Sequence, residues 1–276
     1  MSRLISKVST LHIMKSLLRD LLPTYCQVPA KYWYRWLRGT LEEEMKILGS
    51  LIRSGDRVID VGGNRGLYAY RCWRLGARIE VFEPNPTCLR VLQAWAAGKP
   101  RVSVHSVALS NCSGSANLHI PVDDSGVEHD SSASIEHDGF AHARDQLVEL
   151  RTLDSYGFDK VSLIKIDVEG HEYKVIEGAL GTLASSMPAV LIEIEQRHSG
   201  RPISEVFDKI LRLGYQGFFF SLNGLTAIED FDAARDQSME NFGGMRGRYI
   251  NNFVFLHQRR LANGEYGAVV DGRSMK

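Results

Sequence analysis

The polar and apolar positions of this chain change their spacing at regular intervals. Short runs rich in Val, Ile and Phe have the composition of buried strands, and the segments between them repeat apolar residues at helical spacing. The pattern predicts strands at 57–61, 78–82, 101–107, 162–168 and 189–195, separated by helices that begin near Gly66, Pro86, His171 and Pro202. This alternation predicts an α/β fold with a doubly wound, mostly parallel sheet and a ligand at the carboxyl ends of its strands.

The carboxyl-terminal part departs from the alternation. The apolar strands 215–221 and 250–257 have no clear helix between them, so we expect an antiparallel pair. Another short strand is expected at 115–120. The polar, glycine-containing residues 259–276 predict a loose tail. The expected main domain therefore covers residues 57–258.

Residues 1–56 form a separate amino-terminal extension, which we expect to be helical and to cap the main domain. Apolar residues recur at helical spacing from Leu4 to Leu22, with basic residues among them. We favour packing on the main domain or on a second copy, as in a homodimer, over peripheral membrane contact. Pro23 and Pro29 interrupt the pattern, and the aromatic run 31–36 either packs or stacks on a flat substrate such as a sugar. Residues 41–53 predict a helix that closes over a cofactor.

Composition narrows the function classes. The chain has 276 residues with 33 basic and 33 acidic side chains, so its charge gives no argument for binding nucleic acid. The four cysteines are scattered without a C-x-x-C pair, which indicates reduced thiols. We find no apolar run of membrane-spanning length and no signal-peptide core, and we expect a cytoplasmic protein.

The stretch from Arg57 to Gly66 is a strand that leads into a glycine-rich turn and a helix. Gly62, Gly63 and Gly66 allow a tight turn and close approach of a ligand, and the helix amino terminus favours an anion.

A second strand follows the turn and ends at Glu83, the distance at which nucleotide-binding folds place a ribose-binding carboxylate. Asn64 suits a left-handed position in the turn, and Asn85 can cap the next helix. Asp60 either meets a cationic ligand group or holds the turn. The pattern predicts an adenosine-containing cofactor.

Charged residues interrupt a second strand that should be apolar. Lys165, Asp167 and Glu169 share one face, and Glu193 and Glu195 repeat the anomaly on the expected neighbouring strand. A buried Lys165–Glu193 ion pair is one interpretation. Asp167 lies nearest the carboxyl end of its strand, so we predict that it acts in the active site.

The polar segment 121–146 is expected to be a loop that acts as a lid. Its histidines, His129, His137 and His142, lie among acids, but they lack the close ligand spacing of a metal site. We favour the lid.

Taken in order, several motifs resemble the FkbM-type methyltransferases. They are Asp60-Val-Gly-Gly-Asn-Arg-Gly66, Phe82-Glu-Pro-Asn85, Thr152-Leu-Asp154, Lys165-Ile-Asp-Val-Glu-Gly-His-Glu172, Glu177-Gly-Ala179 and Asn252-Phe-Val-Phe255. The resemblance covers roughly residues 57–257, and the Lys-x-Asp-x-Glu-Gly-x-Glu block is its most specific part.

The resemblance implies a class I, Rossmann-like methyltransferase with a seven-stranded sheet, mostly parallel with an antiparallel closing strand. It implies S-adenosylmethionine as the donor and a hydroxyl of a sugar, glycan or small natural product as the acceptor. Asp60, Gly62 and Asn64 would then hold the methionine part and Glu83 the ribose. Asp167 would lie beside the methyl group. With Gly63, Gly66 and Asn85 these residues form the expected cofactor set.

A neutral hydroxyl needs a base to remove its proton. His171 is a candidate because the positive end of the helix that it opens keeps its ring neutral. Asp167 and His198 are the other candidates. A divalent metal on Asp167 with Glu193 or Glu195 is not favoured, since Lys165 would repel it. The alternative functions are a nicotinamide-dependent oxidoreductase and a non-catalytic binding protein.

Overall fold

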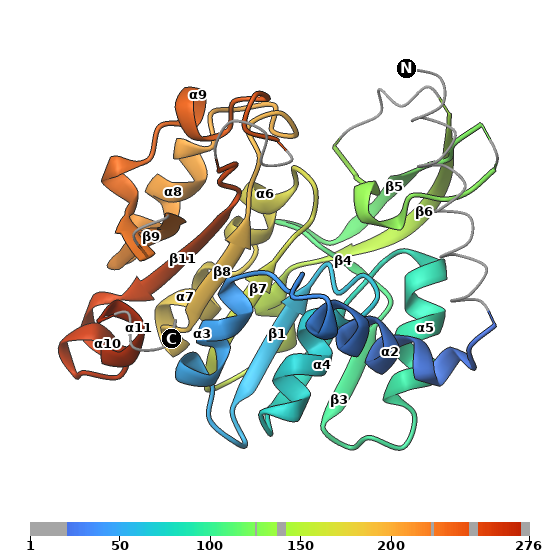
Figure 1. Ribbon diagram of the computed structural model, residues 1–276, viewed down its shortest axis with the longest axis horizontal. Helices are drawn as coiled ribbons and strands as arrows, with labels where there is room; N and C mark the ends of the chain where they lie inside the picture. Colours follow the sequence, from blue (N-terminus) through green and yellow to red (C-terminus); the bar gives the residue numbers. More distant parts are fainter. Residues whose placement is uncertain (1–20, 125, 137–141, 222–223, 243–247, 272–276) are drawn as a thin grey trace.

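The computed structural model describes residues 21–124, 126–136, 142–221, 224–242 and 248–271, and Figure 1 shows their arrangement. A large twisted sheet lies between two layers of helices, and a small second sheet stands beside it, above α5 in this view. Within the described ranges, no helix is both long and apolar enough to cross a bilayer. The helix predicted at the amino terminus, from Leu4 to Leu22, falls almost entirely outside those ranges.

The elements divide between the two sheets and the helical layers. The strands of the large sheet are β1 (Arg57–Val61), β2 (Arg78–Phe82), β3 (Val102–His105), β7 (Val161–Ile166), β8 (Ala189–Glu193), β9 (Tyr215–Ser221), β10 (Gly224–Ala227) and β11 (Asn252–His257). The small sheet consists of β4 (Ala108–Leu109), β5 (Gly114–Pro121) and β6 (Ala143–Arg151). The α-helices are α2 (Thr24–Leu37), α3 (Glu44–Leu51), α4 (Leu67–Arg74), α5 (Pro86–Ala96), α6 (Glu172–Glu177), α7 (Leu180–Ser186), α8 (Ser204–Leu211), α9 (Ala233–Asp236), α10 (Gln258–Ala262) and α11 (Gly267–Val270). Short 3-10 turns are η1 (Asp130–Ser132), η2 (Leu153–Tyr156) and η3 (Ile228–Asp230).

The large sheet has the order β10-β9-β11-β8-β7-β1-β2-β3. Strands β3, β2, β1, β7 and β8 are parallel neighbours, which confirms the doubly wound, mostly parallel sheet. Strand β11 runs antiparallel to both β8 and β9, as predicted for the last two apolar strands. The described part of the sheet has eight strands rather than seven, because β10 folds back on β9. This four-residue strand is too short and too exposed to leave a hydrophobic period.

Alternate residues of β1 face two separate apolar cores. Val58 points to the layer that contains α2, α3, α4 and α5, and Ile59 points to the layer of α6, α7 and α8. Asp60 shares the face of Val58, and Lys165 shares the face of Leu163 in the same core. The two charged side chains therefore project from the sheet toward the amino-terminal helices.

The segment 121–146 differs from the loop that we expected. Strands β5 and β6 pair from Gly114↔Leu150 to Pro121↔Ala143, and bridges join His119 to Ser134 and Val122 to Glu128. The predicted strand 115–120 therefore belongs to the second sheet. The hydropathy pattern does not reveal this strand pairing, because one face of the small sheet is exposed and carries polar side chains.

The amino-terminal helices share the main core. Val28 and Tyr32 of α2 are buried, as are Met45 and Leu48 of α3. Pro29 lies inside α2 rather than ending it, since a helix held by tertiary packing tolerates one missing hydrogen bond.

Residues 259–276 were expected to form a loose tail, and this is wrong for the described part. Tyr266 is 2% exposed and Val269 is 1% exposed, and α11 packs on α3. The spacing of these two apolar residues, about one helical turn apart, indicates a packed helix, although the segment as a whole is polar.

Candidate active site

A cavity of about 280 Å³ opens at the carboxyl edge of the large sheet. The register aligns Val61 with Phe82 and with Ile166, and Ile166 with Ile192, so the residues that follow these strands meet at one edge. Of the residues predicted to form the site, the cavity brings together Asp60, Gly62, Gly63, Asn64, Glu83, Asp167 and His171. Gly66, Asn85 and His198 do not line it.

The glycine turn is held between the ends of two neighbouring strands. The N–H groups of Gly62 and Gly63 both donate to the Phe82 carbonyl, at 2.9 and 3.2 Å. Gly62 has a φ of 75°, and a Cβ there would lie 1.9 Å from the carbonyl oxygen of Asp167. The left-handed conformation and the close approach of backbone both require glycine at this position.

Gly66 serves the helix rather than the cavity. It is the residue before α4, and a Cβ on it would lie 2.9 Å from Leu92 and 3.1 Å from Val28. Gly66 therefore packs between α2, α4 and α5, and its contact with a cofactor stays a prediction. The glycine spacing could not separate these roles, because both require a residue without a side chain.

Glu83 is buried at the end of β2 and ties the turn to the next helix. Its Oε2 accepts from the Asn64 N–H at 2.6 Å, and its Oε1 accepts from the Asn85 N–H at 2.8 Å. Burial raises the pKa of Glu83 to about 7, against the effect of these two hydrogen bonds. Each oxygen keeps a lone pair for a further donor from the cavity.

Asn85 caps α5, as predicted, and is not a wall of the cavity. Its Oδ1 accepts from the Thr87 N–H at 2.9 Å, and its side chain is 1% exposed. Among the described residues its Nδ2 is buried without a hydrogen-bond partner, and its direct contact with a cofactor stays a prediction.

Asp60 carries a polar atom that has no hydrogen-bond partner among the residues that the structure describes. The residue is 3% exposed, and its Oδ2 is buried without a hydrogen-bond partner. Burial raises the pKa of Asp60 to about 6, although Lys165 acts against this shift. A buried acceptor without a partner is costly, so a donor from a bound ligand would relieve that cost.

Lys165 pairs with Asp167 rather than with Glu193. Its Nζ lies 3.6 Å from Asp167 Oδ2 and 4.9 Å from the centre of the Tyr68 ring. Burial opposes the charge of Lys165, but nearby acids, Asp167 first among them, hold its pKa above the ordinary value.

The interpretation of Lys165 and Glu193 as an ion pair is therefore wrong. Lys165 lies closer to Asp167, which is on the same face of its strand. Burial, with a contribution from Asp167, raises the pKa of Glu193 to about 9, and its Oε1 accepts from Asn251 at 2.6 Å. Burial therefore favours the protonated form of Glu193 at the wall of the cavity.

His171 is the residue before α6 and is 3% exposed. Its Nδ1 lies 2.6 Å from Glu136 Oε1 and its Nε2 lies 3.0 Å from Ser110 Oγ. Burial lowers the pKa of His171, although Glu136 acts in the opposite direction. Both ring nitrogens are engaged by protein groups, so the geometry leaves this histidine without a free nitrogen for an acceptor.

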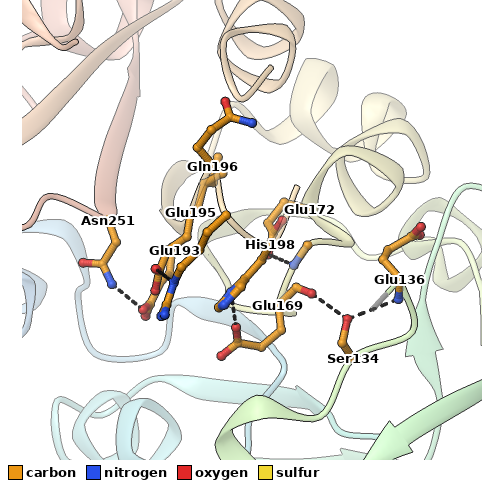
Figure 2. A network of polar contacts seen from close by, with 12 residues as sticks. Ser134, Glu136, Glu169, Glu172, Glu193, Glu195, Gln196, His198 and Asn251 are labelled. Atoms are coloured by element: carbon orange, nitrogen blue, oxygen red, sulfur yellow. Dashed lines mark hydrogen bonds and ion pairs between the residues drawn. The ribbon is translucent and has the colours of Figure 1, made fainter. Parts of the chain in front are cut away.

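His198 forms a pair with Glu169 at the rim of the cavity (Figure 2). The His198 Nδ1 lies 2.7 Å from Glu169 Oε2, and the hydrogen bond with Glu169 raises the pKa of His198. Glu169 lines the cavity, and its carbonyl accepts from Ser134 Oγ at 2.6 Å. The pair resembles the carboxylate–histidine arrangement of general bases in its chemistry.

The segment between β5 and β6, within the residues that we expected to form a lid, supplies part of the cavity wall. Asp130, Ala133 and Ile135 line the cavity, and Asp130 pairs with Arg65 of the glycine turn. Within the described ranges, no group of three His, Cys, Asp or Glu side chains could hold a metal ion. His137 lies outside those ranges.

Two of the sequence motifs support the fold instead of the cavity. Both Asp154 carboxylate oxygens accept from the start of α7, from the N–H groups of Gly181 and Thr182 at 2.8 Å each. Gly178 lies against a neighbouring backbone, where a Cβ would be 1.9 Å from the Ser110 carbonyl. The spacing of the motifs does not distinguish residues that support the fold from residues that contact a ligand.

The sequence prediction missed the contribution of α2. Lys31 and Arg35 line the cavity from this helix, and Arg35 pairs with Glu42 at 3.0 Å. The run 31–36 drew attention for its aromatic side chains, of which Trp33 and Trp36 are exposed. The spacing of four between the two cations was the usable signal, because it places both on one helical face.

Comparison with known proteins identifies a recurrent domain. Residues 60–217 match the methyltransferase FkbM domain. The hexuronic acid methyltransferase AglP of Haloferax volcanii is 30% identical over 171 residues, which are 60% of this chain and 65% of that protein. The chain thus spans less than two thirds of this relative's length.

The solved structures that match this chain are more distant in sequence. Methyltransferase FkbM of Methylobacillus flagellatus is 17% identical with a TM-score of 0.48, over 87% of this chain and 57% of that one. The O-methyltransferase of Bacillus cereus, in complex with SAH, is 12% identical with a TM-score of 0.41, over 88% of this chain and 96% of that one.

Proposed function

The chain belongs to the FkbM methyltransferase family, and from this premise we propose that it uses S-adenosylmethionine to methylate an oxygen of a sugar. The observation that carries the proposal is the meeting of the glycine turn, Glu83 and Asp167 around one cavity at the carboxyl edge of the sheet. The hexuronic acid methyltransferase among its relatives supports a sugar as the acceptor class. Membership of the family argues against the nicotinamide-dependent oxidoreductase considered for the same glycine turn.

The residues of the cavity fit this cofactor. Asp60 offers its unpartnered Oδ2 to an ammonium group, and Glu83 offers lone pairs to the ribose hydroxyls. Val107 and Leu109 provide an apolar wall for a flat base. Gly62 and Asn64 shape the backbone between these groups, while α2 and Glu42, which precedes α3, line the site from the amino-terminal region.

A bound S-adenosylmethionine supplies an electrophilic methyl group on a positively charged sulfur. The chain must then align the acceptor oxygen and remove its proton. We assign the alignment and proton acceptance to Asp167, which lines the cavity with its side chain 35% exposed. The Glu169–His198 pair is the competing base, since its Nε2 is not engaged by any described protein group.

A methyl-transfer screen tests the proposal directly. The protein is incubated with S-adenosylmethionine labelled in its methyl group, and with D-glucuronate, D-glucose, nucleotide sugars and a hydroxylated natural product. We expect label in a sugar, as a methyl ether that survives mild alkali. An alkali-labile product would show methylation of a carboxylate and overturn the hydroxyl assignment. Failure to bind S-adenosylmethionine would overturn the proposal as a whole.

Cofactor affinity should rise with pH between about 5.5 and 8. Burial raises the pKa of Asp60 to about 6 and that of Glu83 to about 7, so both carboxyls become protonated as the pH falls through these values. A ligand ammonium and the ribose hydroxyls bind the ionised forms, so affinity is lost in the acid direction. Calorimetry with S-adenosylhomocysteine should show at least about tenfold weaker binding at the lower pH.

The Asp60→Asn variant is the control for the pH experiment. It removes one of the two titrating carboxyls, so the inflection near pH 6 should disappear while the one near 7 remains. A flat affinity profile in the wild-type protein would contradict the role of both carboxyls.

A further inference from the structure

Most charged side chains that line the cavity form an ion pair, either with another lining residue or with His198 or Arg65, which lie outside the lining. Arg35 pairs with Glu42, Lys165 with Asp167, and His198 with Glu169, while Asp130 pairs with Arg65. Burial raises the pKa of Glu193, and its Oε1 accepts a hydrogen bond from Asn251. Asp60, Glu83 and Lys31 remain without an ion pair among the described residues.

Lys31 is the basic residue among these three. It lies on α2 one turn after Val28, which packs on Gly66 at the start of α4, so the helix crosses the glycine turn. Arg35 follows after another turn on the same face, and its guanidinium is already engaged by Glu42 and by the carbonyl of Thr40. Among the described residues, no hydrogen bond or ion pair is formed by the Lys31 ammonium.

Lys31 is half-buried, so its charge is partly removed from solvent. Burial lowers its pKa, and Arg35 and Arg65 act in the same direction, opposed by Cys88 and Glu42. A charge in such a place is usually retained because it is paired or binds a ligand. A carboxylate satisfies this requirement, as an ammonium is a strong donor to carboxylate oxygens.

We propose that Lys31 binds a carboxylate group of the ligand in the cavity. The inference rests on the proposed function and adds a residue outside the matched domain, which begins at residue 60. Two sources supply this chemistry: the amino-acid end of the cofactor and the acid group of an acidic sugar. The unpaired acid Asp60 and the unpaired cation Lys31 are complementary to a zwitterionic amino-acid end.

Calorimetry with matched nucleosides separates the two sources. S-Adenosylhomocysteine has the amino-acid end, and 5′-methylthioadenosine lacks it. If Lys31 binds the cofactor, Lys31→Met should weaken binding of the first by about tenfold to a hundredfold and leave the second unchanged. Lys31→Arg should restore part of the loss because it retains the charge. Lys46→Met is the matched control, since Lys46 is an exposed lysine of α3.

The second arm uses D-glucuronate and D-glucose with S-adenosylhomocysteine present at saturation. If Lys31 binds the acceptor, Lys31→Met should leave S-adenosylhomocysteine binding unchanged and weaken glucuronate at least tenfold, with no effect on glucose. Thermal unfolding checks the fold: we expect the unliganded variant to be at least as stable as wild type, because the change removes a charge without a partner. Lys31→Gln repeats both arms if the Met variant does not fold.

Different results would refute the proposed function and the carboxylate-binding role of Lys31. If the wild-type protein binds neither nucleoside, the proposed function is refuted and the role of Lys31 falls with it. If the wild-type protein binds both, and the Met and Gln variants bind both nucleosides and glucuronate equally well, the carboxylate role of Lys31 alone is overturned.

Discussion

Replacing Asp167 by Asn should lower kcat for methyl transfer at least about a hundredfold, the lower range for loss of a general base. Asparagine keeps the shape of the side chain but cannot accept the proton of a sugar hydroxyl. The change also removes the acid that lies 3.6 Å from Lys165 Nζ, so the folded state should be checked by circular dichroism. Single-turnover rates at saturating cofactor provide the measurement, and S-adenosylhomocysteine affinity should change only a few fold.

His198→Gln and Glu169→Gln are the matched comparisons for this experiment. They disrupt the other carboxylate-based candidate, the pair joined at 2.7 Å, without touching Asp167. We expect both variants to retain more than a tenth of the wild-type rate. A full rate in Asp167→Asn together with a large loss in His198→Gln would transfer the role of base to the histidine pair.

Replacing Gly62 by Ala should destabilise the protein by about 3 kcal/mol or more. The left-handed conformation costs alanine about 1–2 kcal/mol, and forcing a methyl group into packed atoms costs about 1–3 kcal/mol more. At this position the new Cβ would lie 1.9 Å from the Asp167 carbonyl oxygen, and the end of β1 would have to separate from β7. Urea unfolding monitored by fluorescence gives the difference in unfolding free energy.

Gly98→Ala is an unusually close control. Gly98 has a φ of 74° against 75° for Gly62, but nothing lies within 4 Å of a Cβ built on it. It should therefore show the cost of the backbone conformation alone, about 1–2 kcal/mol. If the two variants lose the same stability, contact with the Asp167 carbonyl does not restrict residue 62.

Local sequence signals predicted those parts of the site that follow a strand. Gly62, Glu83 and Asp167 come directly after β1, β2 and β7, and a parallel sheet places such residues at one edge whatever the details of packing. Gly66 and Asn85 belong to the same motifs but do not line the cavity. A motif predicts which segment forms the site. Whether a given residue of that segment faces the cavity depends on the conformation of the turn.

Pairing of charges was harder to predict than their position. The alternation of β7 placed Lys165 and Asp167 on one face, yet the sequence interpretation paired Lys165 with Glu193 on the neighbouring strand. Glu193 instead accepts a hydrogen bond from Asn251, the residue before β11, which lies more than fifty residues farther along the chain. Such a partner leaves no local signal.

The sequence by itself determined the α/β class, the mostly parallel sheet, the glycine turn with its acid on the next strand, and the resemblance to the family. These features arise from hydrophobic period and from short-range backbone requirements, which are properties of contiguous residues. The tertiary structure decided which charges are paired, that His171 has both nitrogens engaged, and that Lys31 of α2 faces the cavity. These features depend on contacts between residues far apart in the chain, and no local pattern specifies them.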